Sequence, residues 1–293
     1  MINLNKKRSL RIFGVITLVV TLFFGLAFYA GIFRVLDRLV DADAIWLLLV
    51  LGAQAFSYWA YVIPYKCVFN LDIRSAVEHS FAGFYPLYVK SGLAYDRKTL
   101  CYKREKISPY YLSLWEYVVL APLVLVAAIY GSIFGKLPPL LSFPWIIGVP
   151  LGSIFFGLAF VLQKRLTRFP RVQKAVDFIL GMLKHQNFKN VIILLAGMTA
   201  YWLGELVSLW GALQLFNIKL SWFALLIAYA TGYVVSRRNL PLGGAGIVLI
   251  SLAFALHWVG LALPVALLVA LAYQVCNLIM PQIVYHSRFI IYR

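Results

Sequence analysis

The hydrophobic positions of this 293-residue chain form long runs, and the polar positions collect between them. About twenty apolar residues in a helix cross the hydrocarbon core of a bilayer, which is about 30 Å thick. The pattern therefore predicts an all-α polytopic membrane protein with about six full transmembrane helices. The runs are Leu10–Phe33, Ala44–Ile63, Tyr110–Tyr130, Pro144–Leu162, Val191–Leu215 and Leu261–Tyr285. The polar segments between them are too short for a soluble domain, so residues 1–293 are expected to form a single integral membrane domain.

Two further apolar segments, 76–94 and 220–259, are interrupted by proline and glycine. Pro86 breaks the first, and Pro241 precedes a cluster of glycines in the second. Proline removes a backbone donor and kinks a helix, and glycine permits left-handed turns. Irregular backbone inside a membrane survives only where protein buries it or where it lines a watery cavity. One interpretation is two ordinary kinked helices. The other is two broken or re-entrant hairpins, one in each half, an arrangement typical of transporter binding sites.

The two interrupted segments begin from opposite faces of the predicted membrane. Segment 76–94 starts inside, and segment 220–259 starts outside after Lys219. If both are re-entrant, the two halves are inverted repeats. If the second hairpin instead crosses twice, Arg237 and Arg238 simply reach the cytoplasm. The sequence leaves both arrangements open, and the C-terminus lies inside in either case.

The basic residues predict the orientation. The chain has 27 Lys and Arg against 10 Asp and Glu, for a net charge of +17. The predicted inside segments 66–106 and 163–189 hold eight and seven basic residues, whereas the outside loops hold one or two each. Basic residues collect on the cytoplasmic side of a membrane protein. We therefore expect a multi-pass protein of the cell membrane with both termini in the cytoplasm, and nucleic acid is not an expected partner.

Composition adds two expectations. With 63% hydrophobic and 13% charged residues, the chain falls outside the range of soluble proteins. The basic loop 163–189 contains apolar residues at helical spacing after Pro170, which is typical of an interfacial helix on an anionic leaflet. A short connector packed on the bundle fits the same pattern. The three cysteines and four histidines show no metal-ligand spacing, so no metal site and no cofactor are predicted.

Three stretches resemble one family of membrane proteins. Leu240–Pro281 contains a glycine cluster, then a tyrosine and a proline: Gly243, Gly244, Gly246, Tyr273 and Pro281. Val89–Leu120 contains a glycine, three polar or basic residues and a glutamate: Gly92, Arg97, Tyr102, Lys103 and Glu116. A third motif consists of Tyr201, Trp202 and Glu205. Together they resemble the lysylphosphatidylglycerol synthase transmembrane-region family, also called flippase-like. The chain departs from the family at Leu93, Leu249 and Gln274, where acidic, acidic and arginine side chains are usual.

The resemblance implies that the protein acts on lipids. Family members make and flip aminoacylated phosphatidylglycerol or belong to hopanoid and polyprenyl-linked sugar pathways, and aminoacyl transfer resides in a soluble domain that we do not expect here. We therefore expect a flippase-like or scramblase-like translocase of an anionic phospholipid or lipid-linked intermediate, with no catalytic residue. The alternative is an accessory or catalytic membrane subunit of envelope lipid or glycan synthesis, with Glu78 and His79 as acid and base. A homo-oligomer or a synthase partner is compatible with both.

Ionisable residues inside apolar segments mark the candidate site. Membrane-embedded carboxylates are costly, so Glu116 and Glu205 are functional candidates, although a structural hydrogen bond would also explain them. Arg237 and Arg238 precede the glycine break, where the next helix would point its N-terminus at an anion. Two arginines there would hold a phosphate in bidentate geometry, with Lys90 facing the same cavity. Anchoring at a cytoplasmic turn is the alternative for this pair. The resemblance adds Arg97 and the three glycines to the predicted substrate-binding residues.

Overall fold

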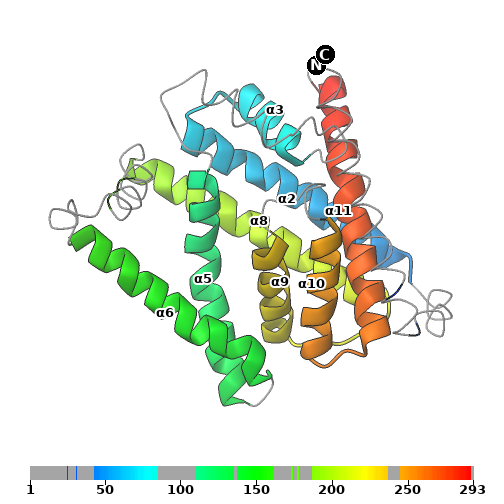
Figure 1. Cartoon of the computed structure of the whole chain (residues 1–293). Coiled ribbons are helices and arrows are strands. Elements are labelled where there is room, and N and C mark those ends of the chain that lie inside the picture. Colours follow the sequence, from blue (N-terminus) through cyan, green and yellow to red (C-terminus); the bar gives the residue numbers. More distant parts are fainter. Residues whose placement is uncertain are drawn as a thin grey trace, which may run out of the picture.

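The computed structural model describes residues 43–84, 110–134, 137–161, 187–236 and 245–291, together with Gly25, Gly31, Gln173 and Asp177. These residues form helices and no strand, as the sequence predicts (Figure 1). The helices are α2 (Ile45–Phe69), α3 (Ile73–Phe84), α5 (Tyr110–Ile133), α6 (Pro139–Val161), α8 (Phe188–Gln214), α9 (Trp222–Ser236), α10 (Ala245–Trp258) and α11 (Leu263–Ile291). The all-α fold class is confirmed for this part of the chain.

Three of the described helices are long and apolar enough to cross a membrane. They span Ile45–Phe69, Leu114–Ile133 and Phe188–Gln214. Shorter apolar stretches occupy α6, α9, α10 and α11. The first predicted span, Leu10–Phe33, lies outside the described residues except at Gly25 and Gly31. The helices thus support a membrane protein, whereas length and composition identify three spans where the sequence predicts about six.

The packing leaves many apolar side chains on the outer surface and buries a few polar side chains within an apolar core. Large apolar residues such as Leu48, Val126 and Ile154 are well exposed. The core meanwhile contains the polar side chains of Gln54, Ser57, Ser80, Glu116, Ser142, Glu205, Ser208 and Gln274. In water such an outer face would cost free energy, because apolar surface is driven out of water. In a bilayer the same face contacts lipid at no cost, so the outer surface is suited to a membrane.

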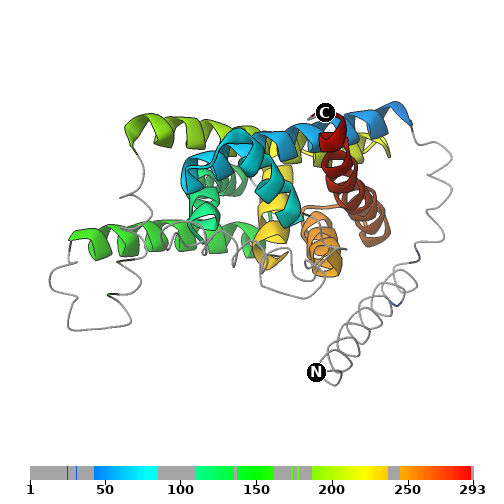
Figure 2. The same ribbon diagram turned by 90° about the horizontal axis from the view of Figure 1, so that it is seen from above.

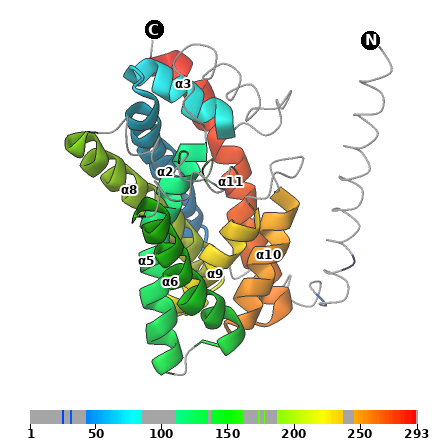
Figure 3. The same cartoon turned by 60° about the vertical axis from the view of Figure 1, so that its left-hand side comes forward.

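Helices α2 and α8 form the central pair of the bundle and run side by side in opposite directions (Figures 1 and 3). Three glycines at intervals of seven residues, Gly197, Gly204 and Gly211, face α2. A Cβ at Gly204 would stand 2.8 Å from Cβ of Ser57 and 3.0 Å from the carbonyl oxygen of Ala53. Small residues let membrane helices approach closely, where van der Waals contacts drive their association. The glycines therefore set the distance between the two helices.

Several helix boundaries differ from the predicted ones. Helix α2 continues through Pro64 to Phe69, six residues beyond the predicted end, because a proline inside an apolar helix need not end it. It stops at Asn70, whose left-handed backbone (φ 47°) lets its N–H donate to the carbonyl of Lys66. Helix α6 begins five residues early, at Pro139, where the missing proline N–H has no helical partner to lose.

Helix α3 covers the first nine residues of the predicted broken segment 76–94, and the remainder lies outside the described residues. Asp72 precedes the helix and accepts a hydrogen bond of 3.1 Å from the backbone N–H of Ser75. Hydrogen bonds from Ser75, first its side chain and then its backbone, lower the pKa of the Asp72 carboxyl. The helix packs on α2 and α11 with Ala76 and Val77 fully buried. Its start is thus fixed by an N-cap and its position by an apolar face.

Helices α9 and α10 form a close pair between α5 and α11 (Figure 1). They contain 15 and 14 residues, which makes each shorter than the roughly 20 residues of a full span. At Gly232 a Cβ would stand 3.2 Å from Cα of Leu252, so the two backbones meet closely there. Residues 237–244 between them lie outside the described part. The predicted break extended to Gly246, but α10 already begins at Ala245, so Gly246 is helical.

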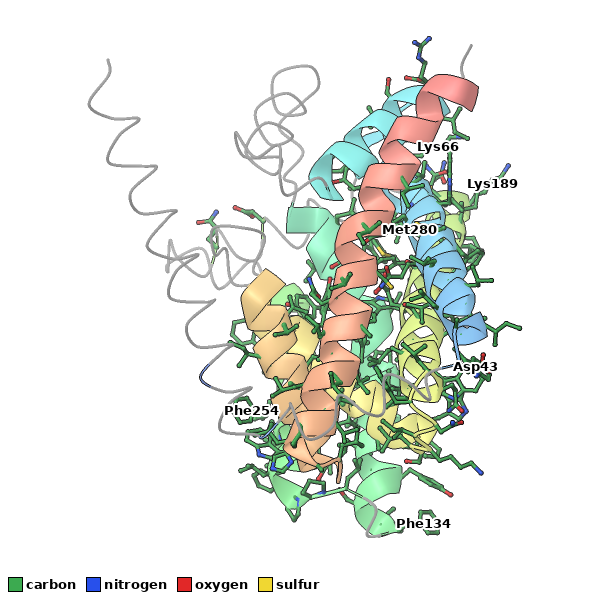
Figure 4. All side chains as sticks on the ribbon, turned by 90° about the vertical axis from the view of Figure 1, so that its right-hand side faces the viewer. Asp43, Lys66, Phe134, Lys189, Phe254 and Met280 are labelled. Atoms are coloured by element: carbon green, nitrogen blue, oxygen red, sulfur yellow. The ribbon has the colours of Figure 1, made fainter. Side chains whose placement is uncertain are left out.

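The labelled residues near the helix ends lie towards two different ends of the bundle. Lys66 and Lys189 lie towards one end of the bundle, whereas Asp43 and Phe134 lie towards the other (Figure 4). Seen from above, α10 and α11 lie next to each other at one side of the molecule and α6 at the opposite side (Figure 2). Segment 66–106 therefore begins, at Lys66, towards the same end of the bundle at which segment 163–189 ends, at Lys189.

Candidate functional site

Two glutamates are buried in the core of the bundle. Glu116 on α5 has no exposed surface, and Glu205 on α8 is 2% exposed. Both helices are otherwise apolar along most of their length. A carboxyl group at this depth is costly unless hydrogen bonds or a positive charge satisfy it. The side chains around the two carboxyls therefore decide what each can do.

The Glu205 carboxyl is held by three hydroxyls from three other helices. Ser57 Oγ of α2 donates to Oε1 over 2.7 Å. Tyr229 of α9 donates to Oε2 over 3.4 Å, and Tyr273 of α11 donates a short hydrogen bond to the same oxygen. No basic side chain of the described residues pairs with this carboxyl. Glu205 thus connects α8 to α2, α9 and α11 through neutral donors alone.

The Glu116 carboxyl is held by two tyrosines. Tyr61 of α2 donates to Oε1, and Tyr233 of α9 donates to Oε2, both through short hydrogen bonds. Glu116 therefore joins α5 to the same two helices, α2 and α9, that contact Glu205. The carboxyl is oriented by donors on both sides, as a binding or proton-carrying group would need to be.

The two carboxyls form successive rungs of one ladder. On α2, Ser57 contacts Glu205 and the residue four positions on, Tyr61, contacts Glu116. On α9, Tyr229 contacts Glu205 and Tyr233, again four positions on, contacts Glu116. Residues four apart lie on one helix face, separated by about 6 Å along the axis. The carboxyl ladder, meaning these six residues, therefore runs along the α2 and α9 faces for about one turn.

Aromatic rings enclose the ladder. The indole of Trp202 lies edge-on to Tyr229 and Tyr233, with ring centroids 5.5 Å and 4.6 Å away. Tyr201 packs on Tyr61 at 4.7 Å. Aromatic pairs favour edge-to-face and tilted arrangements of this kind over flat stacking. The motif of Tyr201, Trp202 and Glu205 noted in the sequence thus forms one wall of the site, with a carboxyl beside two rings.

Further polar groups continue from Glu205 towards α11. Gln54 Nε2 donates to the backbone carbonyl of Tyr273 over 3.3 Å. Tyr58 donates to Asn277, over 3.0 Å to its carbonyl and by a short hydrogen bond to its side chain. The side-chain oxygens Gln54 Oε1, Ser208 Oγ and Gln274 Oε1 are buried and have no hydrogen-bond partner among the described residues. The core is polar where α2, α8 and α11 meet.

The structure describes three of the nine predicted site residues, and one of the three, Gly246, lies in the first turn of α10. Glu116 and Glu205 lie in the core, on neighbouring rungs of the ladder. Tyr273, which matched the tyrosine of the family motif, donates to Glu205. Leu249 and Gln274, where the chain departs from the family it resembles, are both buried. Six predicted residues lie outside the described part, so their placement stays a prediction: Lys90, Arg97, Arg237, Arg238, Gly243 and Gly244.

Sequence reasoning missed four partners of the carboxyls. They are Ser57, Tyr61, Tyr229 and Tyr233. Each is a single hydroxyl in an apolar helix, where tyrosine and serine are common without any special role. Their spacing was the available signal, since each helix repeats a hydroxyl after four residues. The spacing alone does not say which carboxyl each hydroxyl meets.

The chain matches no family profile, no characterised protein and no solved structure. The resemblance to the flippase-like family therefore rests on the residues of this chain and stays a prediction.

Proposed function

We propose that this chain is a flippase-like or scramblase-like translocase that moves an anionic phospholipid or lipid-linked intermediate across the cell membrane. The carboxyl ladder carries the proposal. It places two carboxyls and four hydroxyls inside an apolar bundle, at the junction of the long pair α2 and α8 with the short pair α9 and α10. Ionisable groups facing the interior of a membrane bundle mark paths for polar substrates. We also propose membership of the lysylphosphatidylglycerol synthase transmembrane-region family.

The proposed architecture has about six spans and two re-entrant hairpins. Helices α9 and α10 support the second hairpin, because each is too short to cross and they pack on each other. Helix α3 is short as well and begins the corresponding segment of the first half. Two hairpins that enter the membrane from opposite faces would make the two halves inverted repeats, with the polar site between them. A headgroup could then pass the ladder while the acyl chains stay in lipid.

Both termini are proposed to lie in the cytoplasm. A chain without its native cysteines, carrying Asp43→Cys or Lys189→Cys, tests this in intact cells. Both positions are exposed, and they lie at opposite ends of the antiparallel pair α2 and α8. A membrane-impermeant thiol reagent is expected to label Asp43→Cys alone. Labelling of Lys189→Cys alone would reverse the orientation.

Translocation itself is tested in proteoliposomes. The purified chain is reconstituted with a lipid that carries a fluorophore on its acyl chain, and an impermeant reductant bleaches the outer leaflet. Lipids with a phosphatidylglycerol and with a phosphatidylcholine headgroup are compared. For the anionic lipid, we expect the reductant to bleach more than the half of the fluorophore that lies in the outer leaflet. Equal bleaching of protein-containing and protein-free vesicles, for both lipids, would contradict the proposed function.

Arg237 and Arg238 are proposed to bind the phosphate of the headgroup. They follow α9 directly and precede α10, whose N-terminus carries about half a positive charge. The Arg237→Gln/Arg238→Gln pair is expected to lose at least about tenfold in translocation rate, corresponding to about 1.4 kcal/mol of barrier. The Arg237→Lys/Arg238→Lys pair should lose activity as well, because lysine cannot hold phosphate in bidentate geometry.

The alternative for the two arginines makes a different prediction in the same assay. Anchors at a cytoplasmic turn need only positive charge, so the lysine pair would keep full activity. Expression is matched by fluorescence of a fused reporter, and Ser153→Ala on the outer face of α6 serves as the neutral control. Full activity in the glutamine pair would rule out the phosphate site.

A further inference from the structure

A band of polar side chains lies at one level of α2, α8 and α11. We call it the polar layer: Gln54, Ser57, Glu205, Ser208 and Gln274. Two hydrogen bonds show that these side chains lie at the same height in the bundle. Ser57 Oγ donates to Glu205, and Gln54 Nε2 donates to the carbonyl of Tyr273, the neighbour of Gln274. Ser208 follows Glu205 by three residues and therefore lies on the same face of α8.

Three oxygens of the polar layer are buried and unpartnered. Gln54 and Ser208 have no exposed surface, and Gln274 is 7% exposed. Gln54 Oε1, Ser208 Oγ and Gln274 Oε1 have no hydrogen-bond partner in the described part of the chain. A buried acceptor without a donor costs free energy, and native cores leave few of them. Three such oxygens in one layer leave lone pairs that a bound group could contact.

The fourth oxygen ligand of the polar layer comes from an ionisable carboxyl group, that of Glu205. The Glu205 carboxylate receives hydrogen bonds from neutral hydroxyls only, and no described basic side chain offsets its charge. Tyr58 also lies near Glu205, and its phenol is neutral in its ordinary state. An unpaired carboxylate inside a membrane bundle favours a cationic partner. A serine hydroxyl that donates its hydrogen still has lone pairs for a cation.

We propose that the polar layer binds one alkali-metal cation, Na⁺ or K⁺, between α2, α8 and α11. Carboxylate, amide and hydroxyl oxygens are hard ligands that suit hard cations. A single carboxylate matches a single positive charge, whereas divalent cation sites use more. The described residues contain no group of three His, Cys, Asp or Glu side chains, which transition metals would require. Tyr229 of α9 donates to Glu205 as well, so the proposed site is in contact with α9.

The site is tested by binding, independently of any lipid movement. The purified full chain in nanodiscs is heated in NaCl, KCl or choline chloride at constant ionic strength and pH. A ligand that binds only the folded state raises the unfolding temperature in a saturable way. We expect saturation with Na⁺ or K⁺ and no response to choline. The cation with the lower half-saturation concentration is the natural occupant. An identical unfolding temperature in all three salts would overturn the site. A second series varies the pH in each salt, and an unfolding temperature that responds to pH but not to the cation would overturn the site as well and assign the position to a proton.

Three variants locate the cation. Glu205→Gln keeps the shape of the side chain and should abolish the cation response. Gln54→Leu and Ser208→Ala keep the carboxylate and should each raise the half-saturation concentration by at least about tenfold, equivalent to one lost ligand of about 1.4 kcal/mol. Gln214→Leu and Ser153→Ala are the matched controls, because both lie outside the layer. An unchanged cation response in both Gln54→Leu and Ser208→Ala would overturn the proposal even if Glu205→Gln did not fold.

Discussion

Replacing Gly204 with alanine is expected to lower the free energy of unfolding by about 1–3 kcal/mol, the usual cost of overpacking a core. The added Cβ would stand 2.8 Å from Cβ of Ser57 and 3.0 Å from the carbonyl oxygen of Ala53. One of these atoms belongs to the backbone, so a side-chain rotation cannot relieve the contact. Gly204→Leu should yield no folded protein, because the two central helices would have to separate. Unfolding in increasing denaturing detergent measures both variants.

The control for Gly204 is a glycine of another apolar helix. Gly152 of α6 has no atom within 4 Å of its would-be Cβ, so Gly152→Ala and Gly152→Leu add the same groups without a clash. Both should leave stability unchanged or raise it, since glycine is a poor helix former. Equal stability of Gly204→Leu and Gly152→Leu would show that α2 and α8 do not depend on close approach at this position.

Replacing Glu205 with leucine is expected to abolish translocation and to lower the free energy of unfolding by about 2 kcal/mol or more. The substitution leaves the hydroxyls of Tyr229 and Tyr273 buried without their acceptor, whereas Ser57 can still donate to the carbonyl of Gln54, 2.9 Å away. Each unpaired buried group costs about 1–3 kcal/mol. Detergent unfolding measures the stability, and the proteoliposome assay measures the transport.

A second variant separates the two effects. The quadruple change Glu205→Leu, Ser57→Ala, Tyr229→Phe and Tyr273→Phe removes the carboxyl and its three donors together. Replacing a buried polar network by apolar groups of similar shape is often neutral or stabilising, so stability should recover. Translocation should stay lost. Tyr130→Phe, on the outer part of α5, controls for loss of a phenol hydroxyl. Wild-type transport in the quadruple variant would show that Glu205 has only a structural role.

The helical class and the apolar segments followed from the sequence because hydropathy depends on local composition. A run such as Val191–Leu215 must bury its backbone polar groups within itself, so a helix is the only solution in lipid. The structure places α8 within three residues of that run. The two glutamates were identified for a similar reason, since a carboxylate in an apolar run is costly wherever its helix lies.

The tertiary structure decided which hydroxyl contacts which carboxyl. Ser57 and Glu205 are 148 residues apart, and Tyr233 and Glu116 are 117 apart. They meet because Gly204 brings α8 close to α2 and because the short pair α9 and α10 packs between α5 and α11. The sequence by itself determined that these helices are apolar and that two of them contain a carboxyl. Only the packing of the helices determined that one turn of α2 and one turn of α9 hold both carboxyls, since contacts between distant segments depend on shape that local composition does not encode.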